Sequence, residues 1–473
     1  MDSNRLTQLS GTELAKLIVT KELSPVEVTE AYLERIDALD SRLNAYITVC
    51  REEALAEARK AEEAVVRGDK LGPLHGLPLG VKDQFETRGV LTTSGSRSLG
   101  DNVPKTDATV VARAKEAGAI LIGKTTMTQF ASGLGDHWQY GDPPRNPWDL
   151  ERDTIGSSNG SAIGIAASMC AISLGEDTGG SIRCPASATG VVGLRPTWGR
   201  VSRHGMHGLS WSMDTGGPIT RTVEDAALMM NAIAGYDPQD SLTSKLPVPD
   251  YTRSLSTDLR GVRVGLLQEL TDPEFTDEEV VQAVSDAAKQ LEGLGATVEE
   301  TSLPLLREVG AVAGPVTGSD SAYVHRNGLR NRPEDYGRNL RLRLTVSSLI
   351  PGYVLQKAMR ARALVRREWL KLFQRFDVLL SPTLMFTLGK IEYAEPITTR
   401  EQAQRRFGKG TGDATITAPF VGTPAMTVPC GFDSNGVPIG LQIMGSHFQE
   451  EKVLKVGHAY ESSTPWHSRR PAL

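Results

Sequence analysis

The feature that most constrains this chain is a block of small residues between Gly156 and Gly193. Its 38 residues include eight glycines, seven serines and six alanines, and its charged members are Glu176, Asp177 and Arg183. Small residues let backbone segments approach closely and leave amide N–H groups accessible. The block therefore predicts a tightly packed buried helix with its turns, or a site where backbone amides face a ligand, and the two can coexist.

The composition is that of a globular protein without covalent cross-links. The chain has 473 residues, a net charge of −5 and 39% hydrophobic residues, a charge balance that argues against a general nucleic-acid binder. Its four cysteines form no CxxC pair, and neither HExxH nor GxGxxG occurs, so we expect no cofactor and no metal site. The start of the chain has no signal-like apolar segment and no apolar stretch reaches membrane-spanning length, so we expect a cytoplasmic location.

Local patterns predict alternating helices and strands. Capping boxes at Ser10 and Ser24 predict helices in an N-terminal part of about residues 1–68. Short apolar runs predict buried strands at 119–122, 262–266 and 378–380, and helical periodicity covers 277–294, 355–376 and 450–462. This alternation indicates an α/β fold with a mixed central β-sheet covered by helices on both faces. Because no linker divides the chain, we expect a single domain over residues 1–473.

One stretch, from Arg326 to Arg375, is strongly basic, with 13 Lys or Arg and three acidic residues. An apolar stripe at helical spacing within it consists of Val365, Trp369, Leu372 and Phe376. We interpret this stretch as a solvated helical region docked on an acidic body. The alternative is a helix that faces a membrane or binds an anion.

Two formal motif matches lie in unsuitable surroundings. Residues 118–125 fit the phosphate-binding loop, yet their middle is an apolar, strand-like run where that loop needs an open turn. Residues 156–160 fit the nucleophile elbow of serine hydrolases with Ser158 at the centre, but polar residues precede them and no histidine stands in a catalytic setting. We expect neither function, and we interpret Ser158 and Ser161 as helix-start capping and packing residues.

The strongest chemical signal is the segment GEDTGGSIR, residues 175–183. A serine preceded by two glycines can sit in a turn whose consecutive N–H groups point into one hollow and stabilise an oxyanion, where each donor typically contributes ~3 kcal/mol. The expected donors are Thr178, Gly179, Gly180 and Ser181. Asp177 and Arg183 flank the turn and can pair to hold it.

A serine nucleophile at this turn needs a base. Without a suitable histidine, the candidates are a lysine and a second serine. Lys82 ends the apolar segment GLPLGVK, and Ser157 lies in another Gly/Ser turn 24 residues before Ser181. To accept a proton, Lys82 must be neutral, so its surroundings must lower its pKa from about 10.4.

Together these segments resemble the amidase signature family. The similar motifs are GLPLGVKD, RNPWD leading to GSSNGSA, EDTGGSIR followed by GVVGLRPTWGRVS, MDTGGP, RTVEDAALMMNAIAG, GTPAMTVP and GLQIMG, which span nearly the whole chain. The resemblance implies a Ser–cis-Ser–Lys triad with Ser181 as nucleophile, Ser157 as bridging serine after a cis peptide bond, and Lys82 as base.

The resemblance also implies a reaction class. We expect an amidohydrolase that cleaves the C–N bond of a small or aryl amide, anilide or carbamate (urethane) through an acyl-enzyme. The alternative is the glutaminase subunit of a tRNA-dependent amidotransferase, which would need partner chains, and a third interpretation is a binding scaffold. The expected partner is the small-molecule substrate, with no nucleic acid and no membrane, and the chain would be a monomer or homodimer.

Departures from the family pattern concern the substrate pocket. Ile155 and Asn159 replace glycines of the usual loop, and Thr126 and Gln129 stand where many relatives have Asn and Glu. We expect a pocket formed by residues 127–137, Ile155 and 310–420, with the basic helical insertion (about 320–376) shaping the entrance. We expect Phe130, Trp138 and Tyr140 either to line this pocket or to pack in the hydrophobic core.

Overall fold

The described residues form one large mixed sheet. The structure is a computed structural model that describes residues 3–132, 139–140, 142–391 and 414–473. Its strands are β1 (Tyr46–Val49), β2 (Pro78–Lys82), β3 (Ile120–Thr125), β4 (Ile172–Asp177), β5 (Val192–Arg195), β6 (Thr215–Thr220), β7 (Arg263–Leu267), β8 (Thr297–Thr301), β9 (Val378–Pro382), β10 (Ala425–Phe432) and β11 (Pro438–Gly445). They lie in the order β1-β3-β2-β4-β6-β5-β10-β11-β9-β7-β8. β2 is parallel to β3 and β4, whereas β4 is antiparallel to β6.

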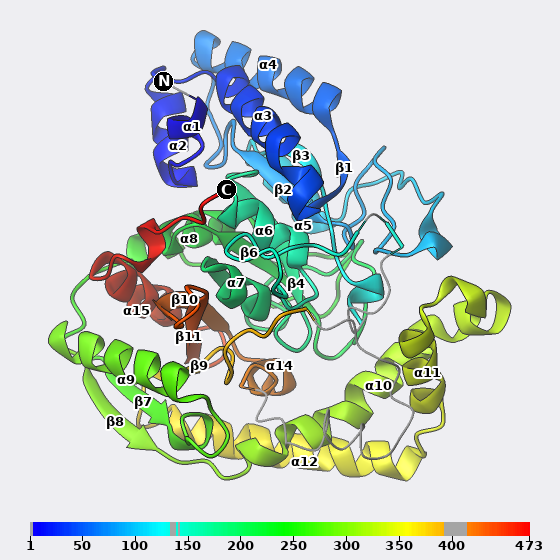
Figure 1. The fold of residues 1–473 in the computed structure, drawn as a ribbon, viewed down its shortest axis with the longest axis vertical. Coiled ribbons are helices and arrows are strands. Elements are labelled where there is room, and N and C mark those ends of the chain that lie inside the picture. The colour runs from blue at the N-terminus through cyan, green and yellow to red at the C-terminus, as the bar shows by residue number, and fades with distance from the viewer. Residues whose placement is uncertain (1–2, 133–138, 141, 392–413) are drawn as a thin grey trace.

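Helices cover both faces of this sheet, which confirms the expected α/β fold (Figure 1). They are α1 (Ser3–Leu6), α2 (Gly11–Val19), α3 (Pro25–Leu43), α4 (Arg51–Arg67), α5 (Thr109–Glu116), α6 (Asn159–Ala166), α7 (Arg183–Thr189), α8 (Val223–Ile233), α9 (Glu278–Gly293), α10 (Leu306–Asn331), α11 (Arg338–Ser348), α12 (Gly352–Leu372), α14 (Thr417–Val421) and α15 (Glu450–Ser462). α6 and α7 pack on each other and on central strands, whereas α15 joins α8 and α9 in a second group.

The N-terminal part is helical, as expected, but it also supplies a strand. The capping boxes at Ser10 and Ser24 are formed, and Pro25 occupies the first turn of α3. Between α3 and α4, β1 pairs antiparallel with β3 at one end of the sheet. Sequence analysis did not predict this strand, because its four residues are too few to show an alternating pattern.

The phosphate-loop match is part of a buried strand. β3 contains its apolar residues, and Lys124 is fully buried, with its ammonium 2.7 Å from Thr92 Oγ1 and 3.3 Å from Asp83 Oδ1. A lysine held in this way cannot reach a phosphate at the surface. This geometry supports the expectation that the motif is not a phosphate-binding loop.

The basic stretch forms most of a helical layer. α11 and α12 pack on α10, away from β1 to β6 (Figure 1). The apolar stripe of Val365, Trp369, Leu372 and Phe376 is buried in a second hydrophobic cluster, separate from the main core, that also contains residues of β7, β9, β10 and β11. This layer is therefore docked through that stripe. Within the described ranges, no helix is both long enough and apolar enough to cross a membrane.

Gly160 sits where the helix α6 meets the end of β3. Its N–H donates to the carbonyl of Thr126, 2.9 Å away. A Cβ added at Gly160 would lie 2.1 Å from the carbonyl oxygen of Ala45 and 2.4 Å from the amide nitrogen of Thr126. Only glycine permits this backbone contact, which fixes the start of α6 and the Ser157 turn before it.

We expect Gly160→Ala to lower the free energy of unfolding by about 1–3 kcal/mol, because neither backbone segment can move without breaking sheet contacts. Urea denaturation measures the change. The matched control is Gly293→Ala at the exposed end of α9, where an added Cβ meets nothing within 4 Å. That change is expected to stabilise by up to about 1 kcal/mol. Equal effects of the two substitutions would contradict the close-contact argument.

Candidate active site

A pocket of about 380 Å³ opens beyond the end of β4. Its walls come from the two Gly/Ser turns, from the segment after β3, and from α10, α11 and the start of α14. The lining residues are Thr128, Ala131, Ser132, Gly156, Ser157, Thr178, Gly179, Gly180, Ser181, Cys184, Leu209, Thr317, Arg343 and Ile416. The small-residue block thus does both things expected of it, since it packs closely as α6 and also forms a pocket.

Two turns meet at the floor of the pocket. One precedes α6 and contains Ser157, and the other joins β4 to α7 and contains Ser181. The N–H of Ser158 donates to the carbonyl of Ser181 at 3.2 Å and ties the turns together. The peptide bond between Gly156 and Ser157 is cis. The two serines therefore face one cavity although 24 residues separate them.

Lys82 lies behind Ser157, at the end of β2. Its ammonium nitrogen is 2.7 Å from Ser157 Oγ and 3.0 Å from Glu176 Oε2. Lys82 and Glu176 are fully buried. Burial lowers the pKa of Lys82, and the carboxylate of Glu176 opposes that shift. The structure therefore brings together the three residues that sequence analysis grouped, and it adds a carboxylate that sequence analysis did not.

The hydroxyl of Ser181 is on the pocket surface and makes no hydrogen bond to any described residue. Of the four amides expected to bind an oxyanion, that of Gly180 donates to Asp177 Oδ1 at 2.9 Å. The amides of Thr178, Gly179 and Ser181 have no such partner in the described part of the chain. These three amides, and not that of Gly180, are therefore free to donate to a ligand oxygen.

Gly180 has a different, conformational role in the same turn. Its φ of +128° is a value that residues with side chains rarely adopt. A Cβ there would lie 2.4 Å from Thr415 Oγ1 and 2.7 Å from Cys184 Sγ. Glycine at this position lets the turn approach both neighbours.

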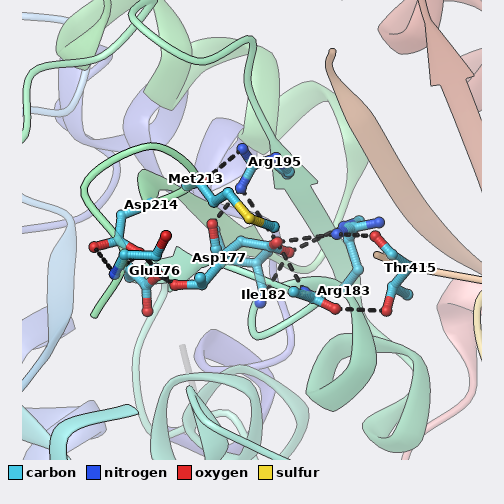
Figure 2. A network of polar contacts seen from close by, with 12 residues as sticks. Glu176, Asp177, Ile182, Arg183, Arg195, Met213, Asp214 and Thr415 are labelled. Carbon is cyan, nitrogen blue, oxygen red and sulfur yellow. Dashed lines mark hydrogen bonds and ion pairs between the residues drawn. The ribbon is translucent and has the colours of Figure 1, made fainter. Parts of the chain in front are cut away.

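Asp177 holds the turn through two buried arginines. Figure 2 shows its carboxylate between the guanidinium groups of Arg183, at 2.9 Å, and Arg195, at 3.3 Å. Arg183 also donates to Gln442 and to the carbonyl of Thr415. Burial alone raises the pKa of Asp177, but the two arginines prevail and lower it to about 2. The Asp177–Arg183 pair was expected from the sequence, whereas Arg195 and Gln442 were not.

Several expected pocket residues lie elsewhere. Ile155 packs beside Ala188, Leu388 and Val437 and does not line the pocket, so the expectation that it forms the pocket wall was wrong. Phe130 belongs to a buried cluster with Tyr336, Leu340 and Leu344, and Tyr140 contacts the carbonyl of Ser96. Trp138 lies outside the described residues, as do 133–137 and 392–413.

The other two serines near the start of α6, Ser158 and Ser161, hold backbone carbonyl groups. Ser158 Oγ donates to the carbonyl of Glu176 and Ser161 Oγ to that of Leu174. The packing role is confirmed, but Ser158 gives α6 no side-chain cap, so the capping role was wrong. No histidine is among the described residues that line the pocket. The described residues contain no group of three or more His, Cys, Asp or Glu that could hold a metal ion.

Comparison with known proteins identifies the family. The model of the Amidase family matches residues 27–454, and the chain belongs to this amidase signature family. It is 42% identical to a glutamyl-tRNA(Gln) amidotransferase subunit of Moorella thermoacetica over 99% of both chains. Among solved structures, it resembles a member of a vestigial protein complex connected with the evolution of an s-triazine catabolic enzyme (TM-score 0.88, 33% identity, 96% and 98% coverage). It also resembles a peptide amidase bound to chymostatin (TM-score 0.85, 31% identity, 98% and 99% coverage). The protein is a hydrolase of non-peptide carbon–nitrogen bonds.

We expect Asp177→Asn to lower the free energy of unfolding by about 3–5 kcal/mol, because it leaves two buried guanidinium groups without a carboxylate. Denaturant titration measures this loss. The control is Asp258→Asn, which removes a surface pair with Arg260 and should leave the midpoint unchanged. Because the folded-state pKa of Asp177 is about 2, below its ordinary 3.8, its contribution is full above pH 4 and disappears as the pH falls towards 2. A stable Asn variant would show that the pair does not hold the turn.

Proposed function

We propose that the protein hydrolyses amides with Ser181 as the nucleophile, Ser157 as the bridging serine and Lys82 as the base. The observation that carries the proposal is the 2.7 Å contact between Lys82 Nζ and Ser157 Oγ, directly behind the pocket that both serines line. Burial lowers the pKa of Lys82, which favours the neutral amine that can accept a proton.

In this mechanism Lys82 takes the proton of Ser157, and Ser157 takes the proton of Ser181 as Ser181 attacks the carbonyl carbon. The amides of Thr178, Gly179 and Ser181 hold the oxyanion, and removal of such a donor typically costs ~3 kcal/mol of transition-state stabilisation. Ser157 then protonates the leaving amine. Water hydrolyses the acyl-enzyme by the same proton path in reverse.

The pocket supports a substrate that carries a negative charge. Arg343, on α11, reaches the pocket wall and donates to the carbonyl of Ser132 at 3.3 Å. Unlike Arg183 and Arg195, it forms no ion pair with a described residue, and desolvation lowers its pKa. A guanidinium beside a pocket, without an ion-pair partner among the residues that the structure describes, is suited to bind a carboxylate.

Glutamine is the first substrate we propose, since it combines a small amide with a carboxylate. The full-length likeness to a glutamyl-tRNA(Gln) amidotransferase subunit supports this choice. In that role the chain would act with partner subunits and release ammonia for them. All four cysteines are buried and form no disulfide in the described part of the chain, which supports a reducing cytoplasmic location.

A free-standing amidohydrolase of a small or aryl amide, anilide or carbamate is the second candidate. The likeness to a peptide amidase along the whole chain supports it. In either case Arg343, which lies within the basic insertion (about 320–376), lines the pocket, which supports a role of that insertion in shaping the entrance. As a free-standing enzyme the protein would be a monomer or homodimer.

The first experiment measures hydrolysis of glutamine, a chromogenic aryl amide and a matched aryl carbamate. We expect Ser181→Ala to lower kcat more than about a thousandfold on any substrate cleaved, with an unchanged thermal midpoint, because the relay then has no nucleophile. The control is Ser187→Ala on α7, whose buried hydroxyl has no hydrogen-bond partner. Substantial activity of Ser181→Ala would refute the assignment. Cleavage of only the aryl substrates would favour the free-standing enzyme, and cleavage of only glutamine would favour the amidotransferase role.

The role of Arg343 has its own prediction. We expect Arg343→Met to raise KM for glutamine about 10- to 100-fold, the value of a lost charge-assisted hydrogen bond, and to leave cleavage of an uncharged aryl amide within about threefold. Arg341→Met is the matched control, since Arg341 is exposed on the same helix and does not line the pocket. Equal losses on charged and uncharged substrates would show that Arg343 has only a structural role.

A further inference from the structure

A second carboxyl group lies beyond Glu176, on the side away from Ser157. Glu176 Oε1 is 2.5 Å from Thr178 Oγ1, and the same hydroxyl is 2.6 Å from Asp214 Oδ1. Figure 2 shows Glu176 and Asp214 side by side at one end of the network. Glu176, Thr178 and Asp214 are buried. Lys82, Glu176, Thr178 and Asp214 therefore form one continuous buried chain of polar groups.

Counting hydrogens in this chain locates a proton. The hydroxyl of Thr178 has one hydrogen and can donate it to only one carboxylate, yet both carboxyl oxygens are within 2.6 Å. The other contact therefore needs a hydrogen on the carboxyl group. Lys82 stabilises the negative charge of Glu176, so this hydrogen belongs on Asp214, which donates to Thr178 while Thr178 donates to Glu176.

The electrostatics of Asp214 agree with this hydrogen count. Burial and the charge of Glu176 raise the pKa of Asp214 to about 7, although the contact with the Thr178 hydroxyl and the N–H groups of Ser210 and Leu209 oppose the shift. The other charged groups that act on this unit are Asp177, which raises the pKa of Lys82, and Arg195, whose own pKa Glu176 raises. One negative charge on Glu176 thus faces one positive charge on Lys82.

We propose that Glu176 is a positioning residue for Lys82, which it holds against Ser157 and from which it accepts a proton across their 3.0 Å contact. This inference rests on the proposed function. In the transfer, an N–H bond of Lys82 breaks and an O–H bond on Glu176 Oε2 forms, so an ion pair becomes two neutral groups and no proton leaves the site. The amine can then act as a base, and the ammonium that forms during acylation keeps its hydrogen bond to the neutral carboxyl group of Glu176.

The arrangement explains how a lysine next to a carboxylate can act as a base. An isolated ion pair of this kind would keep the amine protonated, because an adjacent negative charge favours the charged form. Because Asp214 is already protonated, Glu176 is the carboxyl group of this buried chain that accepts the proton of Lys82. Without Glu176, the fully buried amine of Lys82 would have to release its proton to solvent.

The test is the pH profile of Glu176→Gln on a substrate that the wild type cleaves, either the chromogenic aryl amide or glutamine. In the wild type the proton of Lys82 can stay on Glu176, whereas in Glu176→Gln the buried ammonium must lose it to solvent, so the acid limb of kcat/KM should move to higher pH by about one unit. We expect kcat to fall at least tenfold, with KM within threefold. Glu176→Asp, which keeps the charge, should restore the wild-type position of the acid limb.

The control is Glu461→Gln, which replaces another buried carboxyl group, on α15, that accepts the N–H of Val223 and contacts no pocket residue. It should change neither kcat nor the pH profile. If Glu176→Gln does not fold, Glu176→Asp is measured alone and should show lower kcat with an unshifted acid limb. An inactive Ser181→Ala together with an unshifted acid limb in Glu176→Gln would overturn this inference and leave the proposed function standing. An active Ser181→Ala would overturn the proposed function itself.

Discussion

The carboxylate of Asp177 is the constraint on which the pocket depends. It ends β4 and accepts hydrogen bonds from the amides of Gly180 and Ile182 as well as from two arginines. Those contacts fix the backbone of the turn, and the turn in turn fixes the direction of its free amides. A buried ion pair contributes little to stability by comparison with an apolar contact of the same size. Its value here is that it allows one geometry of the turn and excludes others.

Features that depend on neighbouring residues could be predicted from the sequence, whereas contacts between distant segments could not. The strands predicted at 119–122, 262–266 and 378–380 and the helix caps at Ser10 and Ser24 depend on neighbouring residues, and local patterns located them, as β3, β7 and β9 and as the starts of α2 and α3. The grouping of Lys82 with Ser157 and Ser181 came from motifs, and the parallel pairing of β2 with β4 accounts for it, because the ends of these strands meet at the same edge of the sheet.

The contacts that sequence analysis missed are of two kinds. Arg195 comes from another strand, and Gln442 and Arg343 come from elements more than 200 residues away from their partners, and no local pattern records which strand or helix will face the pocket. Glu176 was visible as one of the charged members of the small-residue block, but no local pattern gave it a role. Adjacent strand residues point to opposite faces, so only the sheet topology shows that Glu176 faces Lys82 and Asp177 faces the arginines. The same limit explains Ile155, whose bulk points away from the pocket.

The pocket is built on more than one hydrophobic cluster. Ser157, Ser181 and Lys82 stand on elements of the main core, whereas Thr317 and Arg343 stand on the helical layer, which packs in a second cluster through α10 and α12 and in a smaller cluster with Phe130 through α11. Substitutions in that layer can alter the size and charge of the substrate wall without disturbing the packing that orients the serines. Such a division lets an ancestral catalytic core be fitted to new substrates through changes in one layer of helices, which is a physical basis for divergence of specificity within a single fold.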